Sequence, residues 1–344
     1  MQNIDIMKFD KRTLLKKIKA RLWAEIVSTL RHTRIYPIIY TSYWHKKFIT
    51  PKVAGHAQNY FTAVPNTGAG IGHQLANWIA GYWFAKQFGL TFAHTPFSEN
   101  KWETFFGFGE NELSADDLVE NSGYRKVLLP LFDETNHSEI DQIKKIIESY
   151  TEKKVVFVAE QDQFYRDQFG VISEIKMKFY NGHCRQNDRL IYSNSNFNVA
   201  IHVRRGDITI GQENKNENLL MRWQDNDYFV KVLSRTLEEL NNVDKPISIY
   251  LFSQGAVEDF TEFADFKNIN FCLGMNAQQS FLHMVYADVL ITSKSSFSYK
   301  PALLSNGIKV CPDNFWHGYP DTDDFIIADS TGNFKSKLIS SIIY

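Results

Sequence analysis

Two adjacent arginines follow a short apolar run in the middle of the chain. The run covers residues 198–203 and has the composition of a buried strand, interrupted by His202. Directly behind it stand two guanidiniums, a glycine and a carboxylate, which are Arg204, Arg205, Gly206 and Asp207. Ligands of open α/β sheets bind beyond the carboxyl ends of the strands, and a guanidinium fork binds two phosphate oxygens at once. These residues predict a site for a phosphate or pyrophosphate, with a structural ion pair as the alternative.

A glycine-rich loop lies between an expected strand and an expected helix nearer the N-terminus. Residues 60–64 have the pattern of the strand, and residues 75–86 have the apolar density of the helix. The loop between them carries Gly68, Gly70, Gly72 and Gln74. Glycines let a backbone approach a ligand closely, and the first N–H groups of a helix bind anions. The spacing fits neither the dinucleotide fingerprint nor a Walker motif, so an ordinary turn is the alternative.

A serine-rich helix start is the third element of this kind. Ser295 and Ser296 follow an expected strand at 288–292 and precede a helix that runs through Leu304. Serine hydroxyls and free N–H groups stabilise negative charge, although serine here is also an ordinary N-cap. The glycine loop lies in the N-terminal half, whereas the arginines and serines lie in the C-terminal half. A phosphate-bearing ligand held between two domains would use all three.

Metal and covalent chemistry have little support. Asp225 and Asp227 precede an amphipathic helix that either can cap, and residues 321–324 form a polar surface turn. Arginines and helix dipoles can neutralise a leaving pyrophosphate without an ion, so no metal site is expected. No Ser or Cys lies in a nucleophile elbow. The cysteines are expected to be buried thiols in a reducing compartment, and they are Cys184, Cys272 and Cys311.

The rest of the chain alternates strands and helices. Further strands are expected at 90–93, 126–129, 155–159, 247–252, 269–273 and 308–310. Helices are expected at 138–150, 228–240, 256–265 and 277–287, with helical patterning over 164–192. Residues 95–125 are assigned no regular structure, and 208–218 are assigned a loop. Such βαβ repetition predicts the α/β class, with parallel sheets covered by helices on both faces.

The composition is that of a globular protein with room for two domains. The chain has 344 residues, of which 44% are hydrophobic and 22% charged, and its formal net charge is -1. The chain has no overall excess of positive charge, so nucleic acid is not expected as a partner. Neither a secretory signal nor an 18-residue apolar span is found, which predicts a cytoplasmic protein.

Residues 11–34 form a basic amphipathic segment. Leucines and isoleucines recur there at helical spacing, with lysines and arginines around them and Glu25 as the acidic residue. Such a helix can lie on an anionic membrane surface, here the inner face of the cell membrane. The alternative is that it packs on the body of the protein with its charges solvated. The excess of basic residues favours peripheral membrane contact.

Three motifs together resemble those of fucosyltransferases. Residues 201–207, Ile-His-Val-Arg-Arg-Gly-Asp, look like the His-Val-Arg-Arg-Gly-Asp signature of α1,2-fucosyltransferases and are close to the His-Val-Arg-Arg-Thr-Asp signature of α1,6-fucosyltransferases. The loop at 68–77 is similar to the Gly-rich, Gln-containing loop of both groups, and 287–298 resemble their third motif. The motifs occur in the family's order over roughly residues 60–316. The chain therefore resembles the α1,2-/α1,6-fucosyltransferase superfamily, and within it bacterial α1,2-fucosyltransferase-like proteins.

The resemblance implies a GT-B-like architecture of two Rossmann-like α/β domains that face a central cleft. We expect a basic helical extension at 1–55, an acceptor-side α/β domain at 56–190 and a nucleotide-sugar-binding domain at 191–344. The implied reaction is inverting transfer of fucose from GDP-fucose to a glycan hydroxyl, with no metal or other cofactor. The basic N-terminal segment suggests a lipid-linked or membrane-proximal acceptor.

The resemblance also implies roles for single residues. Arg204 would hold the β-phosphate, while His202 and Asp207 would shape the nucleotide site. The other residues expected to contact the nucleotide sugar are Arg205, Gly68, Gly70, Gly72, Gln74, Ser253, Gln254, Ser295 and Ser296. Arg205 is alternatively a structural residue paired with a group such as a carboxylate. Glu213 is the first candidate for the general base and Asp207 the second, although a solvated carboxylate is an equal interpretation of Glu213.

The chain departs from the family pattern in three places. Gln254 and Gly255 stand where the family commonly has acidic residues that help to read guanine. Tyr299-Lys300 replaces the Trp-Trp common in the α1,2 group, and Ile208 replaces the Lys or Tyr usual after the motif Asp. Two alternatives therefore stay open. One is a glycosyltransferase of the same fold that uses GDP-heptose or a UDP-sugar, and the other is a protein that binds a nucleotide sugar without catalysis.

Overall fold

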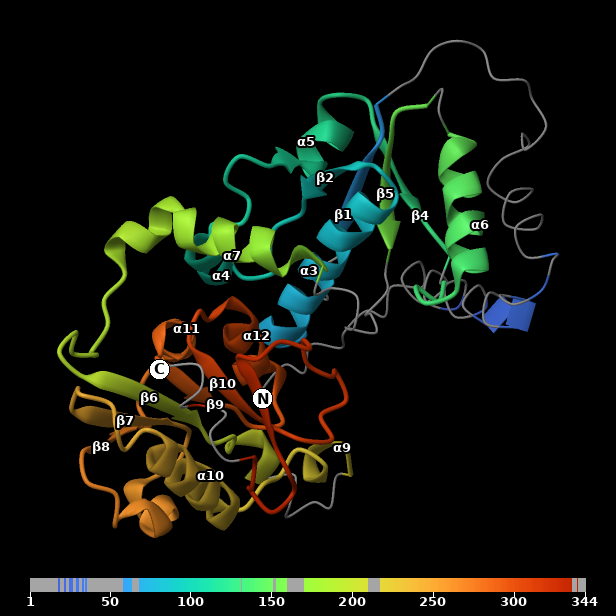
Figure 1. Cartoon of the computed structure of the whole chain (residues 1–344). Helices are drawn as coiled ribbons and strands as arrows, with labels where there is room; N and C mark the ends of the chain where they lie inside the picture. Colours follow the sequence, from blue (N-terminus) through green and yellow to red (C-terminus); the bar gives the residue numbers. More distant parts are fainter. Residues whose placement is uncertain are drawn as a thin grey trace, which may run out of the picture.

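The computed structural model describes residues 18, 22, 25, 26, 29, 30, 33, 35, 58–63, 68–130, 132–150, 153–159, 170–209, 217–335 and 339. These residues form two parallel sheets, one above the other in Figure 1, with helices packed on them. The expected α/β class is confirmed, and so is the arrangement of two parallel sheets expected of a GT-B-like architecture. The expected domain limits remain predictions.

The first sheet contains, within the described residues, five strands in the order β3-β2-β1-β5-β4. All neighbouring strands are parallel. The strands are β1 (Tyr60–Ala63), β2 (Thr91–His94), β3 (Leu113–Ser114), β4 (Arg125–Leu128) and β5 (Val155–Ala159). Its helices are α3 (Ile71–Gln87), α4 (Asn100–Phe106), α5 (Ala115–Glu120) and α6 (His137–Glu148). The central strands β1 and β5 are buried along almost their whole length because helices cover both faces of a parallel sheet.

The second sheet contains six strands in the described chain, in the order β11-β10-β9-β6-β7-β8, and again all pairs are parallel. The strands are β6 (Phe197–His202), β7 (Ile247–Phe252), β8 (Ile269–Cys272), β9 (Val289–Ile291), β10 (Ile308–Pro312) and β11 (Phe325–Ala328). Its helical segments are α9 (Glu217–Leu220), α10 (Asn226–Glu239), η3 (Val257–Phe263), α11 (Ala277–Tyr286) and α12 (Ser296–Leu304). From β6 the chain builds outward to β8 and then returns to the other side of β6 for β9. The strand order therefore reverses between β6 and β9, where open α/β sheets bind ligands.

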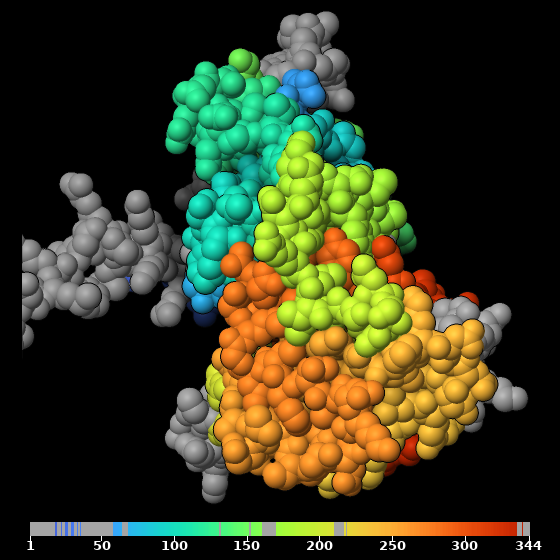
Figure 2. Space-filling model, turned by 90° about the vertical axis from the view of Figure 1, so that its left-hand side faces the viewer, coloured from blue at the N-terminus to red at the C-terminus, as the bar shows by residue number. Residues whose placement is uncertain are grey.

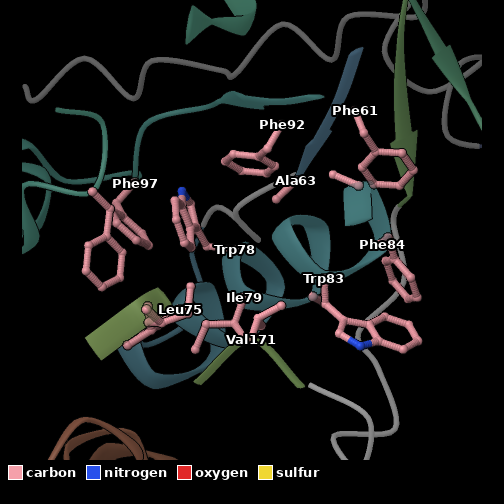
Figure 3. Packing of buried hydrophobic residues seen from close by; sticks show 14 of the residues in the cluster. Phe61, Ala63, Leu75, Trp78, Ile79, Trp83, Phe84, Phe92, Phe97 and Val171 are labelled. Atoms are coloured by element: carbon pink, nitrogen blue, oxygen red, sulfur yellow. The ribbon is translucent and has the colours of Figure 1, made fainter. Parts of the chain in front are cut away.

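The helix α3 lies at the centre of an aromatic core that both halves of the chain share. Figure 3 shows Trp78 beside Phe92 of β2, and their ring centroids are 5.0 Å apart. Phe281 and Leu304, from α11 and α12, belong to the same buried cluster. Burial of large aromatic rings is the main stabilising term in such a core. The two sheets are therefore held together by a continuous apolar core.

The segment between the sheets also binds to both halves. It contains α7 (Ile172–Asn181) and the short helix η2 (His183–Asn187), and Figure 2 shows it in yellow-green along the side of the molecule. Lys176 Nζ donates a hydrogen bond to the Ser305 carbonyl at 2.7 Å, and Tyr180 donates one to the Leu304 carbonyl. These bonds satisfy carbonyls at the end of α12 that have no partner within the helix.

The N-terminal ends of α3 and α12 touch. A Cβ atom built on Gly72 would lie 2.8 Å from both the carbonyl carbon and the carbonyl oxygen of Ser296. Only a glycine leaves room for this approach. The glycine loop of the first half and the serine turn of the second half are therefore direct neighbours.

Several expectations about local structure need correction. The helix α3 begins at Ile71, so the end of the expected glycine loop is already helical. Residues 95–125 contain α4 and α5, which were not expected because each is only about two turns long. Asp225 lies at the N-cap of α10, but its side chain makes no capping hydrogen bond. Its carboxylate instead accepts one from the Trp223 indole at 2.7 Å.

The N-terminal basic segment is described at a few positions only. Ile18, Leu22 and Ile26 are helical and 46%, 54% and 44% exposed. The lysines and arginines expected around them lie outside the described residues. No helix within the described part of the chain is long and apolar enough to cross a membrane.

We expect Gly72→Ala to lower the free energy of unfolding by about 1–3 kcal/mol, because the added methyl group meets the backbone of Ser296. Gly274→Ala is the matched control, since nothing lies within 4 Å of its added Cβ and its backbone is not left-handed. Urea unfolding followed by circular dichroism measures both. Equal stabilities of the two variants would contradict the close contact between α3 and α12.

Candidate functional site

The arginine pair and the serine turn lie next to each other at the switch point of the second sheet. Arg204 follows β6 and Ser295 follows β9, and these two strands pair in parallel. Their carboxyl ends therefore meet at one edge of the sheet. Arg204 Nη1 donates a hydrogen bond to Ser295 Oγ at 2.9 Å. Two of the three elements singled out in the sequence are thus in direct contact, and Gly72 brings the third to Ser296.

The Arg204 side chain is held on two sides. Its Nη2 donates to both carboxylate oxygens of Asp207, at 2.9 and 2.8 Å. The side chain is 21% exposed, and its buried Nε has no hydrogen-bond partner in the described part of the chain. A buried donor without a partner is unusual in a structural ion pair and is more typical of a functional site. Asp207 and Ser295 together orient the guanidinium.

His202 is a buried neutral imidazole behind the arginine. Its Nδ1 shares a hydrogen bond of 2.7 Å with Ser293 Oγ. Burial, with the positive charges of Arg204 and Arg205, lowers the pKa of His202 to about 3. The ring therefore carries no charge at neutral pH. It joins the end of β6 to the turn after β9.

The two serines at the start of α12 have different partners. Ser295 is the N-cap, and its Oγ accepts from the Phe297 N–H at 3.2 Å as well as from Arg204. The N-cap interpretation is therefore confirmed, and the same oxygen positions the arginine. Ser296 Oγ lies 3.2 Å from His317 Nε2, which also accepts from the Trp316 indole. Burial, followed by the charges of Lys300, His73 and Arg222, lowers the pKa of His317 to about 3.

The glycine loop has open space beside its backbone, and the Gln74 side chain holds the loop in place. Nothing lies within 4 Å of a Cβ built on Gly68 or Gly70, and Gly68 has a left-handed φ of +91°. Gln74 is buried, and its Nε2 donates to the Ala69 carbonyl and to Ser98 Oγ. Its Oε1 accepts from the Ser98 N–H at 2.9 Å. The expected contact of Gln74 with the nucleotide therefore remains a prediction, and these three hydrogen bonds show that its amide holds the loop.

A cavity of about 610 Å³ lies beside the carboxyl end of β6 and the two arginines that follow it. Its lining residues come from the C-terminal half and are His202, Val203, Arg204, Arg205, Gly206, Asp207, Phe252, Ser253, Gln254, Met275, Ala277, Ser280 and Phe297. Ser253 Oγ donates to the Val203 carbonyl at 2.6 Å, which ties β7 to the end of β6. Gln254 is exposed and packs over Gly206, where a Cβ would lie 2.0 Å from its Oε1. Both residues line this cavity, and their contact with a nucleotide sugar remains a prediction.

The hydrogen bonds of Arg205 favour the structural interpretation, although its hydrogen-bond partners are not carboxylates. Nη1 donates to the carbonyls of Arg204 and Gln224, and Nη2 donates to Asn226 Oδ1. Its guanidinium lies 4.2 Å from the ring centroid of Trp223. Asp225, Glu262 and Asp259 are close enough to act on its charge. The expected contact with a nucleotide has little support, because the guanidinium is enclosed by its own chain.

The two candidate bases have different outcomes. Glu213 lies outside the described residues, so its role remains a prediction. Asp207 is exposed and accepts both hydrogen bonds from Arg204, which makes it a positioning residue for the arginine.

Metal ligation has no support in the part of the chain that the structure describes. No group of three or more His, Cys, Asp or Glu side chains there could hold an ion. Asp324 pairs with the buried Lys309, and Asp225 accepts from Trp223. Cys272 and Cys311 are buried free thiols as expected, whereas Cys184 is only partly buried.

Some residues that shape the site were not singled out in the sequence. Ser293 orients His202, Trp223 covers Arg205, and Gln224 Oε1 accepts from the Lys294 N–H at 3.0 Å. Ser293 lies at the carboxyl end of β9, so the rule that ligands gather at strand ends could have found it. Trp223 and Gln224 carry no such signal, because their positions depend on how the loop after β6 folds back.

The chain shows only distant similarity to known proteins. No family model matches the sequence, and no curated protein matches it. POFUT1 in complex with GDP-fucose is similar in structure, with a TM-score of 0.44 and 13% identity over 74% of this chain and 97% of that chain. NodZ alpha-1,6-fucosyltransferase co-crystallised with GDP has a TM-score of 0.37 and 14% identity, over 82% and 98%. The fucosyltransferase NodZ from Bradyrhizobium has a TM-score of 0.36 and 15% identity, over 73% and 94%. Likenesses this weak determine neither the fold nor the function of this chain.

The neutral His202 makes stability depend on pH. Its folded pKa of about 3 lies below the ordinary value of 6.5, so the unfolded chain binds more protons between these values. Stability is therefore lost as the pH falls from 6.5 towards 3, by up to about 1.4 kcal/mol per pH unit for this group. We expect His202→Asn to flatten the curve of unfolding free energy between pH 6 and pH 4, measured by urea unfolding. Equal slopes for variant and wild type would contradict a neutral His202.

Proposed function

We propose that this chain is an inverting glycosyltransferase that transfers fucose from GDP-fucose to a hydroxyl of a glycan acceptor without a metal ion. The observation that carries the proposal is the hydrogen bond from Arg204 to Ser295. It holds a guanidinium at the start of α12, on the wall of a cavity of about 610 Å³. The three sequence motifs that resemble those of fucosyltransferases support the donor class.

The proposed reaction needs charge stabilisation more than covalent chemistry. The acceptor oxygen forms a bond to the anomeric carbon as the bond from that carbon to the β-phosphate oxygen breaks, and the configuration inverts. Negative charge grows on the leaving diphosphate, which Arg204 and the start of α12 would stabilise. The acceptor proton passes to a general base, for which Glu213 is the first candidate.

A different nucleotide sugar is the second candidate. Gln254 lies on the cavity wall, at the place where fucosyltransferases commonly have acidic residues. An amide both donates and accepts hydrogen bonds, whereas a carboxylate only accepts them, so the base preference of this chain can differ. GDP-heptose or a UDP-sugar would then be the donor.

A thermal-shift panel of nucleotides and nucleotide sugars tests the donor. We expect GDP and GDP-fucose to raise the unfolding temperature, because a ligand that binds only the folded state stabilises it. A larger shift with UDP or UDP-sugars would favour the second candidate. Protection by a donor, without release of the nucleoside diphosphate in the presence of glycan acceptors, would favour a non-catalytic binding protein.

Arg204→Ala is expected to lower turnover by roughly 10²- to 10³-fold, which corresponds to the loss of one positioned donor to the leaving group. Release of GDP from GDP-fucose in the presence of acceptor measures this. Arg235→Ala is the control, because Arg235 lies on α10 in a surface ion pair with Glu238. Turnover of Arg204→Ala within a few-fold of wild type would contradict the proposal.

The N-terminal segment is proposed to bind the protein to an anionic membrane, at the inner face of the cell membrane, where a lipid-linked acceptor would be found. Ile18, Leu22 and Ile26 are spaced by four residues and share one helix face. Their exposed side chains support membrane contact over packing on the body of the protein.

Deletion of residues 1–34 is expected to abolish co-sedimentation with vesicles that contain phosphatidylglycerol, because both the apolar face and the basic residues are lost. The same vesicles in high salt and neutral phosphatidylcholine vesicles are the controls, and we expect both to weaken binding of the full chain. Unchanged partitioning after the deletion would contradict membrane contact through this segment.

A further inference from the structure

A second arginine lies close to Arg204 without an ion pair in the described residues. Arg222 follows α9 and is half-buried. Its guanidinium lies 5.3 Å from the ring centroid of Trp316, and its buried Nε has no hydrogen-bond partner among the residues that the structure describes. A contact between a cation and a partly exposed indole is a weak interaction. This contact alone does not explain why the Arg222 guanidinium is partly buried and so loses part of its hydration.

The segment that carries Arg222 is firmly attached to the site. The next residue, Trp223, stacks on Arg205 at 4.2 Å. The carbonyl of Gln224 accepts from Arg205, and its side-chain Oε1 accepts from the Lys294 N–H in the serine turn. The position of Arg222 is thus fixed through Gln224, which bonds to Arg205 after β6 and to Lys294 in the turn after β9. Its side chain reaches Trp316, whose indole contacts His317 beside Ser296.

The charges around Arg222 are unbalanced. Burial and then the positive charge of Arg204 lower the pKa of Arg222, and Asp207 is the acidic group that acts in the opposite direction. Both carboxylate oxygens of Asp207, however, accept hydrogen bonds from Arg204. His317, beside Ser296, is kept neutral and adds no charge. Two guanidiniums therefore repel each other at the start of α12, a cost that a bound anion would offset.

We propose that Arg222 is a second guanidinium of the diphosphate site, which binds the phosphates from the side of Trp316 and Ser296 while Arg204 binds them from the end of β6. This inference rests on the proposed function and deepens it. A nucleoside diphosphate carries more negative charge than Arg204 alone can balance. Asp207 already neutralises part of the positive charge of Arg204. A second fork would supply the missing charge and further N–H donors to the phosphate oxygens.

Calorimetric titration of the full chain with GDP and with UDP tests this role. We expect Arg222→Ala to weaken binding of the diphosphate that wild type prefers by about 10- to 100-fold, the usual effect of losing hydrogen bonds to a charged group. Arg222→Gln, which keeps the packing on Trp316, should lose as much, and Arg222→Lys should lose less because it keeps the charge. Without nucleotide, the unfolding temperature of Arg222→Ala should equal or exceed that of wild type, because the repulsion from Arg204 is removed.

The outcomes separate this inference from the function on which it rests. Arg235→Ala, on the surface of α10, should bind like wild type. If wild type binds the diphosphate and both Arg222→Ala and Arg222→Gln bind within two-fold of it, the role of Arg222 is overturned and the proposed function stands. A lower unfolding temperature with unchanged affinity would make Arg222 a structural residue. If wild type binds neither GDP nor UDP, the proposed function fails and the inference fails with it.

Discussion

The site depends on the close contact between the starts of α3 and α12. Gly72 lies against the backbone of Ser296 with no room for a side chain. Because α3 follows β1 and α12 follows β9, this contact fixes the carboxyl edge of the first sheet against that of the second. Two helix starts, each with a partial positive charge, are thereby brought together. The aromatic core around α3 holds this arrangement from behind.

Positive charge is concentrated at this point. Arg204 and Arg222 supply two guanidiniums here. His202 and His317 stay neutral near pH 7, since the pKa of each is lowered to about 3. The histidines therefore contribute hydrogen bonds but no charge. The positive charge near an anion would come from the arginines and the two helix starts.

Particular residues show how far sequence reasoning reaches. Arg204 and Ser295 were each singled out because they follow a strand, whereas the hydrogen bond between them is a finding of the structure. Gln74 carried a motif signal but holds the loop, because its amide is satisfied by Ala69 and Ser98. Arg222 had no signal at all. It lies in an irregular segment, where neither periodicity nor a strand end predicts the neighbours of a side chain.

The sequence by itself determined the α/β class, most strands, and the position of Arg204 and Asp207 beyond the end of β6. These follow from local apolar patterning and from the rule that parallel strands gather their carboxyl ends at one edge. The tertiary structure alone decided which polar groups remain available to a ligand and which are used up by the protein. That choice depends on hydrogen-bond partners more than 20 residues away along the chain, such as Ser98 for Gln74 and Ser295 for Arg204. Local sequence does not encode such partners, because they meet only when the strands of each sheet and the helices that cover it have packed together.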